Sequence, residues 1–232
     1  MKISELITIA ERHMMASVDP VHDILHTKRV VRQVKHLSRQ LGLSKEQKDA
    51  LILAAWWHDV SRKLTKKPSF IWMPLVDDML SAFMLWRETV RQRLFGSVAG
   101  MAARVIFCKS LGTGAFLTRL LIRKRNRIMV HTLRDADFLD GYCIERIEHV
   151  LSLAESSPIY HTGYRVLVRW FFGKRVRMKT TAGQSYIPEQ LATLSAWITR
   201  DDILNWHIEQ FGSSWVEKNI LRSELLLERM ST

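Results

Sequence analysis

The sequence predicts an all-α fold, and two observations carry that prediction. Nearly every segment places apolar residues three and four positions apart, and alternating β-branched runs are few. With 47% hydrophobic and 25% charged residues, the chain lies in the globular range and outside the disordered and fibrous classes. Its 232 residues suit one domain with an extension. We expect a helical bundle over residues 1–157, and a helical extension over 158–232 that packs on it.

The first elements follow from apolar stripes and capping residues. Asp19 and Pro20 are expected to supply an N-cap and a first-turn proline for a long helix near 21–41, which Gly42 ends. A helix over residues 2–16 is expected before it, from one stripe of apolar side chains: Ile3, Leu6, Ile7, Ala10 and Met14.

The remaining elements are placed by the same signals. Ser44 and Gln47 form a capping box for a helix over 45–58. A basic loop over 60–74 follows. Further helices are expected near 75–94, 97–110, 115–124, 126–139, 141–155, 159–172, 188–199, 201–211 and 214–230, with a basic loop at 173–186 before the last three. The sequence Ser156-Ser157-Pro158 is the best internal boundary.

The charge of the chain is unevenly distributed. There are 35 Lys and Arg against 23 Asp and Glu, a net charge of +12. The excess lies in three segments that hold no acidic residue, at 62–67, 119–127 and 165–179. Such clusters favour an anionic partner: a phosphorylated ligand, a nucleic acid, a membrane surface or another subunit. A solvated basic face is the alternative.

Cysteine content and the N-terminal sequence predict a cytoplasmic protein. Two cysteines, Cys108 and Cys143, are too few for a disulfide framework. Glu5, Glu11 and Arg12 interrupt the stretch where a signal peptide needs an apolar run. No apolar stretch approaches the roughly 20 residues of a spanning helix.

Four residues are candidates for a metal centre: His26, His58, Asp59 and Asp137. Metal-assisted hydrolysis needs imidazole and carboxylate groups that converge on one cation and leave a position for water. Adjacent helical residues diverge by about 100°, so His58 and Asp59 can share a cation most easily at a helix end. Taken singly, each residue is equally a polar group on a helix surface or cap.

Three sequence blocks resemble the HD-domain metal-dependent phosphohydrolases, and in particular the small bacterial members. The blocks read HDILHTKRV, AAWWHDVSRK and RDADFLD, in the family's order, and the resemblance covers about residues 13–142. It implies an all-helical domain that hydrolyses a phosphate ester or anhydride. It also implies that His26, His58, Asp59 and Asp137 bind one divalent cation (Mn²⁺, Fe²⁺, Mg²⁺, Ni²⁺, Co²⁺ or Zn²⁺), and that Asp59 orients the attacking water.

The same resemblance suggests further site residues. His22, one turn before His26, is expected to contact a substrate phosphate or transfer a proton. Arg62 stands where nucleotidase members tend to carry Glu, which speaks against a deoxynucleotidase; its planar fork suits catalysis by phosphate binding. Lys63 and Arg29 are further candidate phosphate ligands, although Arg29 could instead pair with Asp135 or Asp140.

The family pattern also bears on metal number. Some members carry a His-His pair between the HD pair and the last Asp, but residues 60–136 contain no histidine except His131. A mononuclear site is therefore expected.

Two functions stay open on this basis. The first is a phosphohydrolase acting on a nucleotide or related small phosphorylated metabolite. The second is a nucleic-acid-binding HD protein that acts on or senses a polynucleotide through the basic clusters at 119–127 and 165–179. A third interpretation keeps the fold and loses the metal.

Overall fold

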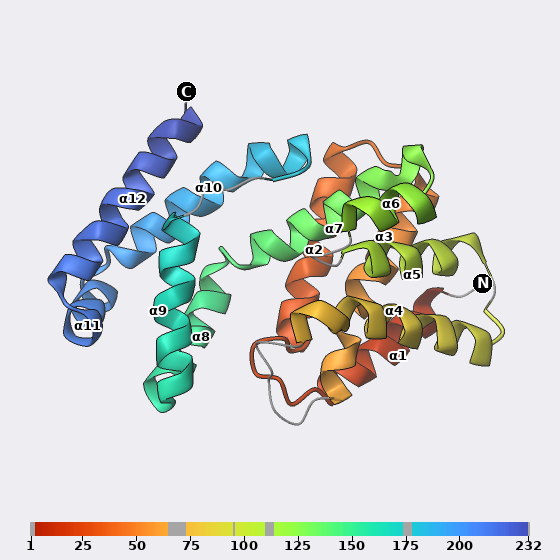
Figure 1. Cartoon of the computed structure of the whole chain (residues 1–232), viewed down its shortest axis with the longest axis horizontal. Helices are drawn as coiled ribbons and strands as arrows, with labels where there is room; N and C mark the ends of the chain where they lie inside the picture. The colour runs from red at the N-terminus through yellow and green to blue at the C-terminus, as the bar shows by residue number, and fades with distance from the viewer. Residues whose placement is uncertain (1–2, 65–72, 95, 110–113, 174–177, 232) are drawn as a thin grey trace. The chain divides into compact units, whose positions relative to one another are not determined.

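The computed structural model describes residues 3–64, 73–94, 96–109, 114–173 and 178–231. These residues form twelve α-helices and two short 3₁₀ helices, and none of them lies in a strand (Figure 1). The expected all-α class is therefore confirmed. Within the same residues, no helix combines the length and the apolar character that crossing a membrane requires.

The chain divides into two compact units, Met1–Asp137 and Phe138–Thr232. The division falls inside one helix, α7 (Arg127–Asp140), so the expected boundary at 157 lies within the second unit. The reason is the packing of α8 (Ile144–Ser156), which contacts α9 (Pro158–Gly173) and α10 (Thr181–Ile198).

The first unit is built around α3 (Lys45–Trp57), which packs against α1, α2 and α5. Its Leu51, Leu53 and Trp57 are fully buried, and the indole Nε1 of Trp57 donates a hydrogen bond to the Leu6 carbonyl at 3.0 Å. The other elements of this unit are α1 (Ile3–Met15), α2 (Ile24–Gln40), η1 (Val60–Leu64), α4 (Met73–Arg91), α5 (Ser97–Lys109), α6 (Gly114–Leu121), η2 (Lys124–Asn126) and most of α7.

The start of α2 differs from the sequence prediction. Asp23, not Asp19, is the N-cap, and its carboxylate accepts a hydrogen bond from the His26 backbone N–H at 2.8 Å. Asp19 instead forms a turn before the helix by accepting from the backbone N–H groups of Val21 and His22. The helix therefore begins at Ile24, which puts His26 in its first turn.

Helix α3 begins with a capping box and leads into a short 3₁₀ helix at its end. The capping box of Ser44 and Gln47 is present as predicted and starts the helix. After Trp57 the chain tightens into the 3₁₀ helix η1, so part of the expected loop over 60–74 is helical. The rest of that loop, residues 65–72, lies outside the described residues.

The second unit contains α8 to α12. Here α12 (Ser213–Ser231) packs against α9, α10 and α11 (Asp201–Phe211). The predicted loop at 173–186 is wrong over its last residues, because Thr180 caps α10 by accepting from the Gly183 backbone N–H at 3.0 Å. That local cap starts the helix at Thr181. Residues 174–177, in the third basic cluster, lie outside the described residues.

Candidate metal centre

The four predicted metal ligands converge from three elements of the first unit. The imidazole Nε2 atoms of His26 and His58 lie 3.3 Å apart. The Asp59 Oδ2 lies 3.1 Å from the His26 Nε2 and 3.4 Å from the His58 Nε2. The Asp137 Oδ1, from α7, lies 3.4 Å from the His26 Nε2 and 3.6 Å from the His58 Nε2.

The backbone at the end of α3 lets two neighbouring residues face one point. His58 is the C-cap of α3, and its ring Nδ1 lies 2.8 Å from the Ala55 carbonyl. A hydrogen bond there places the proton on Nδ1 and directs Nε2 toward the site. Asp59 then starts the tighter turn of η1, in which the Arg62 backbone N–H donates to the Asp59 carbonyl at 2.9 Å. The change of helix type brings the Asp59 carboxylate beside the imidazole of His58.

The donor set fits one divalent cation. Nitrogen and oxygen ligands lie about 2.1 Å from such an ion, so neighbouring ligands are separated by about 3.0–3.4 Å. The separations that involve the imidazole nitrogens run from 3.1 to 3.6 Å, which is close to that spacing, and the donor atoms of His26, His58 and Asp137 all lie within 4.8 Å of one another. His26 and His58 are fully buried, and the buried Oδ2 of Asp59 makes no hydrogen bond to any described residue. Two imidazoles and two carboxylates suit several divalent metals and do not select one.

In the protein without a cation, the charged side chains of the site shift one another's pKa values. Burial lowers the pKa of His58, but the carboxylates of Asp59 and Asp137 outweigh it and raise that pKa to about 9. Burial raises the pKa of both Asp59 and Asp137. The charge of His58 nevertheless holds the pKa of Asp59 well below its ordinary value, and the charge of Lys109 does the same for the pKa of Asp137. The carboxylates are therefore ionised near neutral pH, and a proton on His58 balances part of their charge.

Lys109, the last residue of α5, belongs to the site although no sequence motif marked it. Its Nζ lies 2.9 Å from the Asp137 Oδ2 and 3.2 Å from the Asp78 Oδ1 of α4. Burial lowers the pKa of Lys109, but Asp137, Asp78 and Asp59 together raise it well above its ordinary value. The only sequence signals were a lysine that closes an apolar helix and a pair of aspartates in an apolar segment. The positions of this lysine and of these aspartates in the sequence do not link them to the predicted metal ligands.

Arg62, expected to bind a substrate phosphate, is buried between two carboxylates. Its Nε donates to the Asp77 Oδ2 at 2.5 Å, and its Nη1 donates to the Asp19 Oδ2 at 3.2 Å. The guanidinium thus joins the turn before α2 to α4. Burial raises the pKa of Asp19, but hydrogen bonds from His22 and Val21 and the charge of Arg62 outweigh it and hold it well below its ordinary value.

His22 lies beside His26, although it precedes α2 and does not lie on the helix as expected. Its Nδ1 lies 3.2 Å from the Asp19 Oδ2, and its ring meets the His26 ring edge-on with centroids 5.5 Å apart. Its side chain is 25% exposed, which leaves it accessible from solvent.

Arg29 and Lys63 are the two remaining candidate phosphate ligands. Arg29 is half-buried, three residues beyond His26 on α2. The Nζ of Lys63 lies 2.7 Å from the His13 Nδ1 of α1. Phosphate binding by either residue stays a prediction.

Comparison with known proteins finds no matching family model, curated protein or solved structure. The resemblance to HD-domain phosphohydrolases therefore rests on the three sequence blocks alone. The geometry adds an independent fact, which is that the imidazoles of His26 and His58 lie beside the carboxylates of both Asp59 and Asp137.

Proposed function

We propose that this protein is a metal-dependent phosphohydrolase that cleaves a phosphate ester or anhydride of a nucleotide or a similar small phosphorylated metabolite. One observation carries the proposal: the donor atoms of His26, His58 and Asp137 all lie within 4.8 Å of one another, and the Asp59 Oδ2 lies 3.1 Å and 3.4 Å from the two imidazole nitrogens. An oxygen in that cluster is buried without a hydrogen bond, which a cation would satisfy.

These four side chains would hold the cation. A bound divalent cation supplies Lewis acidity, because it polarises a phosphoryl oxygen and lowers the pKa of water toward neutrality. In our proposal Asp59 accepts a hydrogen bond from the attacking water and fixes its direction. Its burial keeps that carboxylate from turning away into solvent.

His22 is the proposed proton-transfer group. Asp19 holds its Nδ1, so the opposite ring nitrogen is the one available to exchange a proton with the substrate. Arg62 is bonded to both Asp19 and Asp77, which favours a positioning role for it: Arg62 holds Asp19, and Asp19 holds His22. Arg29 and Lys63 remain the proposed phosphate ligands.

The test combines metal analysis with a hydrolysis panel. Purified protein should contain close to one equivalent of a divalent metal, and should hydrolyse nucleotides or a generic phosphate ester when that metal is added. The variants His58→Ala and Asp59→Ala should lose both metal and activity. The control His36→Ala, on an exposed face of α2, should keep both. Activity that survives in the two ligand variants with unchanged metal content would show that the site is misassigned.

A further inference from the structure

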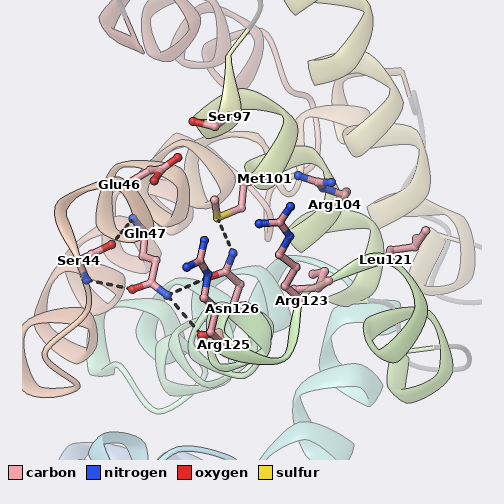
Figure 2. A pocket seen from close by; sticks show the side chains of 11 residues that line it. Ser44, Glu46, Gln47, Ser97, Met101, Arg104, Leu121, Arg123, Arg125 and Asn126 are labelled. Atoms are coloured by element: carbon pink, nitrogen blue, oxygen red, sulfur yellow. Dashed lines mark hydrogen bonds between the residues drawn. The ribbon is translucent and has the colours of Figure 1, made fainter.

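A second concave site lies in the first unit, away from the metal centre. It is a pocket of about 450 Å³ between the start of α3, the first turns of α5, the end of α6 and η2 (Figure 2). This volume lies in the range of small-molecule sites. The residues that line it are Ser44, Glu46, Gln47, Ser97, Met101, Arg104, Leu121, Ile122, Arg123, Arg125 and Asn126.

Three arginines make the lining of the pocket positively charged. Figure 2 shows the guanidinium groups of Arg123 and Arg125 beside Met101, and that of Arg104 on the other side of it, where its Nε donates to the Gly100 carbonyl of α5 at 3.1 Å. Among the described residues, no carboxylate lies within ion-pair distance of any of the three. Glu46 is the single acidic residue in the lining. The pocket therefore holds an excess of positive charge without internal compensation.

The wall that carries two of these arginines is fixed by hydrogen bonds. Gln47, whose Oε1 completes the capping box of α3, also donates from its Nε2 to the Asn126 Oδ1 at 3.0 Å and to the Arg125 carbonyl at 3.4 Å. The Asn126 Nδ2 in turn donates to the Met101 Sδ at 3.6 Å. These contacts tie η2 to α3 and α5, so the arginines project from a backbone that is already ordered.

The neighbouring Arg127 does not line the pocket and binds backbone carbonyl groups instead. Arg127 donates from its Nη2 to the Arg119 carbonyl at 3.2 Å and from its Nε to the Ile122 carbonyl at 3.4 Å. It thereby satisfies carbonyl groups at the end of α6. In the basic cluster at 119–127, Arg127 thus caps a helix and two arginines face a cavity, while Arg119 and Lys124 lie outside the lining.

This pocket is distinct from the metal centre. Ser44 caps the start of α3 and His58 caps its end, so at 1.5 Å per residue the two sites are about 20 Å apart. None of the candidate metal ligands lines the pocket.

We propose that this pocket binds a compact ligand with two or more phosphate groups, such as a nucleoside di- or triphosphate. Guanidinium groups bind phosphate through paired N–H donors, and three of them around one cavity match more than one phosphate. Met101, Leu121 and Ile122 supply an apolar surface for a nucleoside. The small volume of the pocket favours such a ligand over a polynucleotide, which needs an extended track along its backbone.

The experiment measures binding of ATP and of inorganic tripolyphosphate by titration calorimetry, in EDTA so that no cation contributes. Both should bind to the wild-type protein, and ATP should bind more tightly because of its nucleoside. The double variant Arg123→Ala/Arg125→Ala should weaken both affinities by about tenfold or more. The matched control Arg119→Ala/Lys124→Ala removes the same charge from the same segment outside the lining, and should stay within about twofold of wild type.

Further outcomes separate this proposal from the proposed function. Binding should persist in His58→Ala, since the pocket does not use the metal centre. Circular dichroism checks that each variant is folded. Three results would overturn the proposal: no binding of either probe, equal losses in the two double variants, or tight binding of a single-stranded oligonucleotide that ATP does not displace. The last result would assign the arginines to nucleic acid.

Discussion

The ammonium group of Lys109 lies 2.9 Å from one carboxylate oxygen of Asp137, while the other oxygen of Asp137 faces the imidazoles of His26 and His58. The carboxylate thus bridges a fixed positive charge and the position proposed for the cation. Groups that hold a metal ligand from behind set its orientation.

Lys109→Met should destabilise the metal-free protein. It leaves Asp78 and Asp137 close together without their shared counter-charge, and loss of one partner from a largely buried pair costs about 3 kcal/mol or more of the free energy of unfolding. An added divalent cation would replace part of that charge, so it should raise the melting temperature of the variant more than that of wild type. Thermal unfolding with EDTA and with Mn²⁺ measures both effects. Equal shifts in the two proteins would contradict the bridge.

Metal binding should tighten as the pH rises toward 9. In the metal-free protein the pKa of His58 is raised to about 9, so near neutral pH this ring carries a proton that a metal must displace. Because Asp59 and Asp137 are already ionised, they add no pH dependence in this range. The apparent affinity should therefore change by about tenfold per pH unit below that pKa. Calorimetric titrations with Mn²⁺ in buffers of different ionisation enthalpy would count the released protons, and an affinity independent of pH would rule this coupling out.

Arg62→Gln should unfold more easily than wild type. The substitution leaves the buried carboxylates of Asp19 and Asp77 without their common partner, at a cost of about 3–5 kcal/mol in the free energy of unfolding. Arg62→Lys should recover only part of that loss, since an ammonium group cannot donate two N–H bonds in the directions of the guanidinium. Urea unfolding of the three proteins provides the comparison. A Gln variant as stable as wild type would show that the two ion pairs contribute little.

His22→Asn should lower turnover while leaving metal content unchanged. The asparagine keeps a polar group next to Asp19 but cannot exchange a proton near neutral pH, and such transfers contribute about 10²- to 10⁴-fold in rate. The effect should fall on kcat more than on KM, and the acidic limb of the pH–rate profile should change shape. A variant that loses its metal, or whose pH profile keeps its shape, would assign His22 to a structural role.

Much of the fold was predictable because helices are encoded locally. Apolar residues at helical spacing located α1, α3 and α7, and the capping box of Ser44 and Gln47 fixed the start of α3. The predicted cap of α2 was wrong, because Asp23 caps the helix. Asp19 instead forms the turn before it and an ion pair with Arg62, a residue far away in the sequence.

The sequence by itself determined the all-α class and named the four residues that meet at the candidate metal centre, since three short blocks mark them in order. Only the tertiary structure decided what surrounds them. Arg62 and Asp19 are 43 residues apart in the chain, and Lys109 and Asp78 are 31 apart. The physical reason is that periodicity reports which face of a helix is buried, whereas the choice of an ionic partner depends on which helices pack together. The arginine pocket follows the same rule, because α3, α5 and η2 form its lining only when they meet.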